Sequence, residues 1–328
     1  MELRDLFLKG CKVIYRKTFH PEFNADYGDI DRVSANKKIF KLLSDDAPCM
    51  ITRFGTVEIG IVNNYITCHD EKNILNKSLD YITGNTGLPW WDKLHLKSMK
   101  NSAGIFPENI DVLEKFAERY LEDIPFIDLL GAFNYAERYM PLREDVIKVH
   151  LECLYPFFVE NPWTRVFEGK KVLVVHPFTT SIRQQYSRRD KLFENKYVLP
   201  EFELSLIPAV QSAAKSTPPF KDWFEALKYM EDKISDQDFD FCILGCGAYG
   251  LPLAAHVKRI GKKAIHLGGG SQLLFGIKGK RWDNDAYHWR KFPQLNTSYS
   301  NLYNEYWIRP GQEETPKGAQ DVEGACYW

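Results

Sequence analysis

Residues 239–267, FDFCILGCGAYGLPLAAHVKRIGKKAIHL, carry the clearest structural signal in the chain. An apolar run at 239–244 predicts a buried strand, 249–260 has helical periodicity, and the apolar run at 263–267 predicts a second strand. Pro252 suits the first turn of the helix, and Gly261 stands where a helix-ending glycine is common. The stretch therefore predicts a β-α-β unit with two parallel strands.

The same alternation of strand and helix extends outward from this unit. Further apolar, β-branched runs predict strands at 49–54, 125–130, 171–175 and 203–207. Helical periodicity predicts helices at 57–66, 109–122, 143–158, 178–193 and 220–235. We therefore expect an α/β, Rossmann-like fold, with a mostly parallel sheet and helices on both of its faces.

The chain of 328 residues is expected to form a single Rossmann-like domain over 1–300, with a helical lead-in at about 1–47. Frequent Gly, Asn and aromatic residues at 81–107 predict an irregular excursion or lid. Prolines and glycines interrupt the periodicity from about residue 292. Residues 301–328 are therefore expected to form a C-terminal extension that packs along the surface through its tyrosines and tryptophans.

Composition excludes several classes of protein. Hydrophobic residues make up 44% and charged residues 27% of the chain, as in folded globular proteins, and the net charge of -1 gives no attraction to nucleic acid. No uncharged apolar run is long enough for a transmembrane segment, and the N-terminus lacks the apolar core of a secretory signal, so we expect a cytoplasmic protein. Mixed basic and apolar residues at 6–17 fit a peripheral contact with the inner membrane face or an ordinary amphipathic helix. The seven cysteines form no Cys-x-x-Cys pair, which argues against a zinc knuckle.

Ligands of open parallel sheets bind beyond the carboxyl ends of the strands, so the loops after the predicted strands are the candidate site. The first loop is Arg53-Phe54-Gly55-Thr56-Val57-Glu58. Gly55 permits a tight turn, and Glu58 falls in the first turn of the next helix. A carboxylate there could bind a metal, act as a base, or only complement the helix dipole.

The second loop, 176–181, places hydroxyl groups at a predicted helix N-terminus, where they suit phosphate or carboxylate oxygens. His176 is a candidate base, while Thr179 and Arg183 are candidate ligand contacts. The alternative is that Thr179 only caps the helix and that Arg183 lies on a solvated face.

The third loop contains Gly245, Gly247 and Gly250 in a Gly-x-Gly-x-x-Gly pattern between strand and helix, which lets backbone N–H groups approach a phosphate. A dinucleotide fold would also have an acidic residue at the end of the next strand, where this chain has His266. The pattern therefore favours nucleotides other than NAD. The alternative is that these glycines serve only close packing of the helix on the sheet.

The fourth loop, with Gly268, Gly269, Gly270 and Gln272, is expected to line the same crevice. A basic and aromatic segment follows and suits a diphosphate together with a stacked base or sugar: Lys280, Arg281 and Trp282. The chain has no Walker A sequence, nucleophile elbow or His-Glu-x-x-His motif, so hydrolase and ATPase functions have no motif support.

The segment Arg53-Phe54-Gly55-Thr56-Val57-Glu58 resembles the Arg-Phe-Gly-Asp-x-Glu segment of the GT-D-type glycosyltransferases. Further segments resemble GT-D-like proteins of bacterial polysaccharide gene clusters, over roughly residues 50–285: 101–107, 176–178, 245–250 and 275–282. The resemblance implies a Rossmann-like enzyme that uses a nucleotide-diphosphate sugar as donor and a divalent metal, Mn²⁺ or Mg²⁺, held by the Asp-x-Glu pair. It also implies a glycan or lipid-linked acceptor in surface-polysaccharide biosynthesis, and partners among other polysaccharide-assembly enzymes.

One departure from the family pattern affects the expected metal. Thr56 stands where the family has its first Asp, so only Glu58 supplies a matched carboxylate, and a hydroxyl does not replace an anionic ligand for these ions. Three solutions stay open. The donor diphosphate holds the metal, Asp283 or another acid completes the site with Glu58, or Arg281 and Lys280 neutralise the leaving group without metal.

The sequence thus leads to a glycosyltransferase in which Glu58, Arg53 and His176 are the candidate catalytic residues. An NAD-dependent sugar-nucleotide oxidoreductase or epimerase is an alternative, based on the glycine pattern at 245–250. A second alternative is a catalytically degenerate GT-D domain that acts as a partner in polysaccharide assembly.

Overall fold

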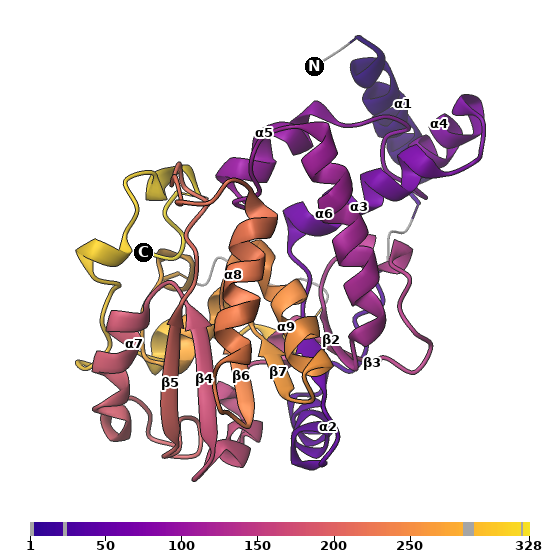
Figure 1. Ribbon diagram of the computed structural model, residues 1–328. Helices are drawn as coiled ribbons and strands as arrows, with labels where there is room; N and C mark the ends of the chain where they lie inside the picture. The colour runs from indigo at the N-terminus through magenta and orange to yellow at the C-terminus, as the bar shows by residue number, and fades with distance from the viewer. Residues whose placement is uncertain (1–2, 22–24, 285–291, 323) are drawn as a thin grey trace.

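The computed structural model describes residues 3–21, 25–284, 292–322 and 324–328. Within these ranges seven strands form one parallel sheet in the order β3-β2-β1-β7-β6-β4-β5 (Figure 1). The strands are β1 (Met50–Thr52), β2 (Leu129–Ala132), β3 (Ile147–His150), β4 (Lys171–His176), β5 (Glu203–Pro208), β6 (Phe241–Leu244) and β7 (Lys263–His266). This architecture confirms the predicted Rossmann-like α/β fold.

Helices cover both faces of the sheet. One face carries α3 (Thr56–His69), α6 (Ile110–Asp123), α8 (Trp223–Ser235) and α9 (Gly250–Arg259). The other carries α2 (Arg32–Ser44), α7 (Thr179–Tyr186) and the short α10 (Ser271–Leu274). Successive strand residues such as Val174 and Val175 therefore enter opposite cores, which explains why the central strands read as unbroken apolar runs.

The helix arrangement also decides where the sheet can bind a ligand. The helices α3 and α9, which follow β1 and β6, lie on one face, whereas α7 and α10, which follow β4 and β7, lie on the other. The neighbouring strands β1 and β7, and likewise β6 and β4, send the chain to opposite faces. Such divergence opens a crevice at the carboxyl edge of a parallel sheet.

Three sequence-based expectations for secondary structure were wrong. The predicted helix at 143–158 is instead strand β3 followed by short 3₁₀ turns, because Ile147 to His150 pair along the outer side of β2. The excursion at 81–107 includes a regular helix, α5 (Lys93–Asn101), capped by the side chain of Asp92. The strand expected at 125–130 begins at Leu129, because Pro125 belongs to a 3₁₀ turn.

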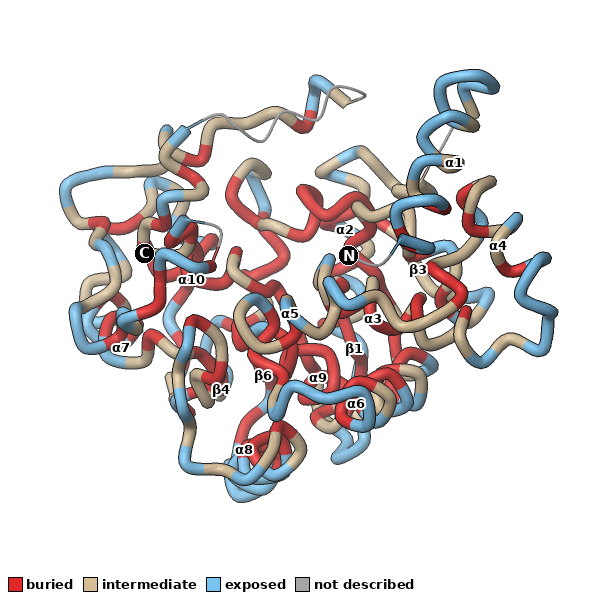
Figure 2. The backbone as a smooth tube through the Cα atoms, turned by 90° about the horizontal axis from the view of Figure 1, so that it is seen from above, coloured by how far each residue is buried: buried red, intermediate tan, exposed pale blue. Residues whose placement is uncertain are grey.

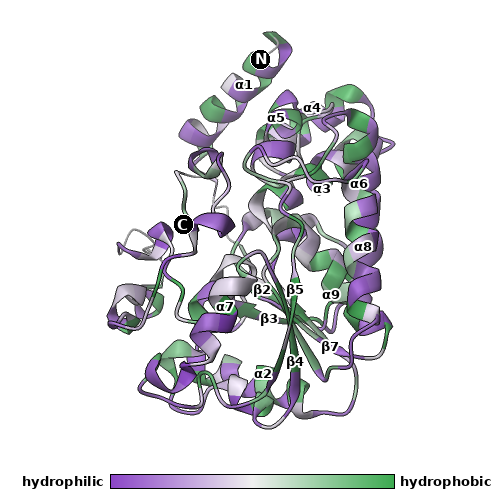
Figure 3. Ribbon diagram, turned by 60° about the vertical axis from the view of Figure 1, so that its left-hand side comes forward, coloured by the Kyte–Doolittle hydropathy of each residue, from purple (hydrophilic) through white to green (hydrophobic). Residues whose placement is uncertain are grey.

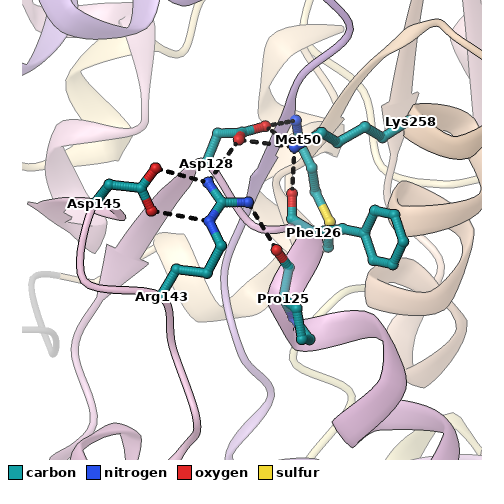
Figure 4. A network of polar contacts seen from close by, with 7 residues as sticks. All are labelled: Met50, Pro125, Phe126, Asp128, Arg143, Asp145 and Lys258. Atoms are coloured by element: carbon teal, nitrogen blue, oxygen red, sulfur yellow. Dashed lines mark hydrogen bonds and ion pairs between the residues drawn. The ribbon is translucent and has the colours of Figure 1, made fainter.

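Opposite the crevice, a polar network joins the amino ends of β1 and β2 (Figure 4). The carboxylate of Asp128 accepts hydrogen bonds from the backbone N–H of Met50 at 2.9 Å and from Lys258 Nζ at 2.6 and 2.7 Å. Arg143 donates to the same carboxylate at 3.1 Å and to the exposed Asp145 at 2.9 Å. Asp128 therefore fixes the register of the central strands against the end of α9.

Three helices stand beyond the carboxyl edge of the sheet, at the upper end in Figure 1: α1 (Leu3–Phe19), α4 (Ile74–Thr83) and α5. The first of them projects from the body of the molecule (Figure 3). No helix in the described ranges is both long and apolar enough to cross a membrane.

Candidate functional site

A cavity of about 360 Å³ lies at the carboxyl edge of the sheet. All four predicted loops, after β1, β4, β6 and β7, contribute to its walls. Twelve predicted site residues line it: Arg53, Gly55, Glu58, His176, Gly245, Gly247, Gly268, Gly269, Gly270, Gln272, Arg281 and Trp282. Figure 2 views this end of the molecule from above, and the backbone of the central strands is coloured as buried. The fold thus brings together segments that lie more than 200 residues apart in the sequence.

Arg53 follows β1 directly and is half-buried at the cavity wall. Its guanidinium lies 4.8 Å from the centre of the Phe133 ring, a cation–π contact that fixes the planar group. Among the residues that the structure describes, the Arg53 guanidinium has no hydrogen-bond or ion-pair partner. A guanidinium left in this state in a cavity has its N–H donors available for a carboxylate or phosphate.

Glu58 is buried in the first turn of α3, and its carboxylate folds back over Gly55. A Cβ atom at position 55 would lie only 1.8 Å from Glu58 Oε2, so this carboxylate position requires glycine there. The carboxylate also faces Tyr120, whose pKa is raised well above its ordinary value, first by burial and then by the charge of Glu58. The Glu58 carboxylate therefore complements the dipole at the N-terminus of α3 and also lines the cavity.

His176 ends β4, and burial lowers its pKa to about 3, so the ring is neutral. The backbone N–H of Phe178 donates to His176 Nδ1 at 2.9 Å. Because that nitrogen accepts, the neutral ring carries its proton on Nε2, beside Gly245. This arrangement favours His176 as a hydrogen-bond donor to a ligand over the base role expected from sequence.

Two further strands also end in buried histidines that sequence reasoning did not assign to the site. His266 ends β7, lines the cavity and faces Thr52 Oγ1 at 3.0 Å, and burial lowers its pKa to about 3. His150 ends β3, and burial lowers its pKa to about 4. Three strands, β3, β4 and β7, therefore end at the carboxyl edge in uncharged imidazoles.

The glycines of 245–250 divide into two roles. Gly247 has a left-handed φ of +56°, and a Cβ there would meet nothing within 4 Å, so its backbone borders open space. Gly250 does not line the cavity, and a Cβ there would lie 2.1 Å from His266 Nε2. Gly250 therefore serves close packing of α9 on β7, whereas Gly245 and Gly247 border the cavity.

The helix N-terminus after β4 is already occupied by the protein's own carboxylate, contrary to the expected ligand contact. Glu314, from the C-terminal extension, accepts hydrogen bonds from the backbone N–H groups of Thr180 at 2.8 Å and Ser181 at 3.3 Å, and from the Ser181 hydroxyl. Thr179 and the exposed Arg183 lie outside the cavity. The predicted chemistry, an anion at this N-terminus, is present, but the anion comes from the chain itself.

The basic segment also holds the C-terminal extension. Lys280 Nζ donates to the Gly324 carbonyl at 3.1 Å and does not line the cavity. Arg281 lines the cavity, donates to the Tyr327 hydroxyl at 3.3 Å and stacks on the ring of that tyrosine. Gln272 donates to the Tyr327 carbonyl at 3.1 Å, and the ring of Tyr327 packs on Gly269. Two residues predicted to bind the ligand, Gln272 and Arg281, therefore also hold residues 326–328 in place.

Several cavity residues were missed by sequence reasoning. Glu152 and Tyr155 follow β3, and their place at the edge depends on a strand that was expected to be helical. Tyr327 and Trp328 were expected to pack along the surface, but they form part of the cavity wall. The short alternation of β-branched residues at 146–149 was the one local signal for the missed strand.

The donor set does not complete the expected metal site. Asp283 pairs with Arg309 at 2.6 Å and lies outside the cavity wall. Thr56 lines the cavity as an exposed hydroxyl. In the described part of the chain no three His, Cys, Asp or Glu side chains lie close enough together to hold a metal ion. The described residues therefore do not fit a metal held by the protein alone.

Searches of protein-family models, of curated proteins and of solved structures gave no match to this chain.

Proposed function

We propose that this protein is a glycosyltransferase that binds a nucleotide-diphosphate sugar in the cavity at the carboxyl edge of the sheet. The observation that carries the proposal is the guanidinium of Arg53, which has no hydrogen-bond or ion-pair partner in the described part of the chain and lies in the cavity wall close to Gly268. Planar guanidinium donors and exposed backbone N–H groups are the usual partners of phosphate oxygens. The resemblance of residues 53–58 to the GT-D pattern supports the sugar-nucleotide class.

In the proposed complex the donor diphosphate lies between Arg53 and the glycine loops that contain Gly247 and Gly268. The base or sugar stacks on cavity aromatics such as Tyr155 and Trp282. The cavity falls in the volume range of ordinary small-molecule sites, about 300–1,000 Å³. The two arginines of the wall, Arg53 and Arg281, equal in number its two acidic residues, Glu58 and Glu152, so the cavity has no formal net charge and a diphosphate must be bound by individual groups such as Arg53.

Transfer requires an acceptor hydroxyl to form a bond to the anomeric carbon while the bond from that carbon to the diphosphate oxygen breaks. The nucleoside diphosphate leaves with the electron pair, and Arg53 stabilises the charge that develops on it. Glu58 accepts the proton of the acceptor hydroxyl, and His176 Nε2–H donates a hydrogen bond to the donor. The acceptor is a glycan or a lipid-linked glycan, in keeping with a role in surface-polysaccharide biosynthesis.

One observation favours a second candidate, an NAD-dependent sugar-nucleotide oxidoreductase or epimerase. Gly250 packs against His266 on the neighbouring strand, which is the role of the third glycine in dinucleotide-binding folds. Against this candidate, β7 ends in His266 and not in an acidic residue that would bind the ribose hydroxyls.

The proposal is tested by thermal unfolding with UDP-, GDP- and CMP-sugars, NAD and NADH, each with and without Mn²⁺. A ligand at a hundred times its Kd adds about 2.7 kcal/mol to the free energy of unfolding. Stabilisation by one class of nucleotide sugar is the expected result. Stabilisation by NAD alone would support the oxidoreductase, and no stabilisation would favour an assembly partner without a donor of its own.

A further inference from the structure

Helix α1 contacts the protein along one side and leaves most of its large apolar side chains exposed. On the packed side Leu8 is buried, Asp5 accepts from Trp90 Nε1 at 2.7 Å, and Lys12 lies 4.1 Å from the centre of the Tyr81 ring. The exposed large apolar residues of this helix are Leu3, Leu6, Phe7, Val13, Ile14 and Phe19.

The neighbouring helices extend this apolar surface. Helix α4 packs on α1 and exposes Ile74, Leu75 and Leu79, and α5 exposes Leu94. Of the fifteen exposed large hydrophobic residues in the described ranges, ten lie on these three helices. We call them the α1–α4–α5 surface. Concentrated exposed apolar area of this kind marks a contact with a partner or a membrane.

The charge of this surface indicates the kind of partner that would fit it. The three helices carry nine basic and two acidic residues, although the whole chain has a net charge of -1. Of the nine, Lys77 is buried and Lys9 pairs with Asp92, which leaves a basic excess on the surface. Exposed cations such as Arg16, Lys17, Lys93 and Lys97 accompany the apolar side chains. A second copy of the chain would bring the same positive charge, so self-association through this surface is opposed electrostatically. Exposed apolar and basic side chains on one helix are typical of helices that lie in an anionic membrane interface.

We propose that the α1–α4–α5 surface docks on an anionic lipid bilayer. Phe7, Ile14 and their neighbours enter the boundary between headgroups and acyl chains, while the basic residues contact lipid phosphates. The helices stand at the same end of the molecule as the carboxyl edge (Figure 1). Membrane docking does not depend on the proposed glycosyltransferase activity. A second step rests on that proposed function: a docked enzyme would take a lipid-linked acceptor in preference to a free glycan.

Vesicle co-sedimentation of the full chain tests the proposal, with neutral phosphatidylcholine vesicles compared with vesicles containing about 30% phosphatidylglycerol. We expect binding to the anionic vesicles that weakens as salt is raised, because the headgroup attraction is screened. Arg16→Gln with Lys17→Gln should lower vesicle affinity about 25-fold, at about five-fold for each cation. Phe7→Ser should lower it further through lost apolar contact.

Matched changes on α2, at the opposite end of the sheet, serve as controls. Lys37→Gln with Lys41→Gln removes the same charge, and Val33→Ser removes an exposed apolar side chain, so both should leave vesicle binding unchanged. Absence of binding to anionic vesicles would overturn the proposal, as would equal loss in the α2 controls. A concentration-dependent dimer that Phe7→Ser abolishes, without vesicle binding, would assign the surface to a second copy instead. Nucleotide-sugar thermal shifts of the same variants report separately on the proposed function.

Discussion

Replacing Arg53 by Gln removes the cation on which donor binding is proposed to depend. The guanidinium makes no ion pair within the described residues, so the expected stability cost comes mainly from the stacking on Phe133, about 0.5–1 kcal/mol, with a smaller part from its attraction to the buried Glu137. A charge-assisted hydrogen bond to a phosphate contributes about 1.5–3 kcal/mol. Since 1.4 kcal/mol corresponds to a factor of ten, the Kd for the nucleotide sugar should rise about 10- to 150-fold.

Isothermal titration calorimetry with the nucleotide sugar found by thermal shift measures this Kd. Arg53→Lys keeps the charge but loses the planar fork, so an intermediate affinity is expected. Arg183→Gln removes the same charge from an exposed position of α7 outside the cavity and should leave the Kd unchanged. An Arg53→Gln variant that is folded and binds the donor within two-fold of wild type would refute the role given to Arg53.

Three further predictions concern the metal, the sheet and pH. Thr56→Asp, at an exposed position of the cavity wall, should supply the second carboxylate of the family pattern. Nucleotide-sugar thermal shifts of this variant should then be larger with Mn²⁺ than without it. Equal shifts would argue against a metal beside Glu58. Asp128→Asn should lower the free energy of unfolding by about 2–3 kcal/mol in urea titrations, because Lys258 loses its ion pair (Figure 4). Asp145→Asn, at the exposed end of the same network, should lower it by only about 0–1 kcal/mol. Similar losses for both variants would contradict the role given to Asp128. Burial lowers the pKa of His150 to about 4 and that of His176 and His266 to about 3, so below pH 6.5 the unfolded chain binds protons that the folded chain does not. The free energy of unfolding should therefore fall from pH 6.5 to 4.5, by at most about 1.4 kcal/mol per pH unit for each histidine. Two buried carboxyls act in the opposite direction, because burial raises the pKa of Glu137 to about 7 and also raises the pKa of Asp123. A flat profile would contradict the buried neutral state of the histidines.

The sheet was predictable because its central strands are buried on both faces. Runs such as 171–175 and 239–244 are therefore continuously apolar and are distinct from the helices between them. The strand β3 lies at the edge of the sheet and is half-exposed at Ile147 and Lys148, so its short pattern also fits a helical period. Strand order and register depend on contacts between distant segments, which local patterns do not encode.

The site was predictable to the extent that it follows from sheet geometry. Loops after parallel strands meet at one edge, which is why Arg53, His176, Gly245 and Gly268 share a cavity. The contacts of the C-terminal extension could not be predicted from local sequence patterns. Nothing near Glu314 in the sequence indicates that its carboxylate would bind the N-terminus of α7, more than 130 residues earlier. The packing of α1 likewise depends on contacts with distant residues such as Trp90, which sequence periodicity does not specify.

The most direct test of the proposed transfer is release of the nucleoside diphosphate from the bound donor by wild type and by Glu58→Gln. The variant keeps the shape of the side chain over Gly55 and should be folded, with a donor Kd within about two-fold of wild type. Loss of the acid–base carboxylate should lower the release rate about 100-fold or more. Release by wild type together with its loss in Glu58→Gln is the predicted result. Equal release by both proteins, or no release by wild type from any nucleotide sugar that it binds, would contradict a glycosyltransferase with Glu58 as its base.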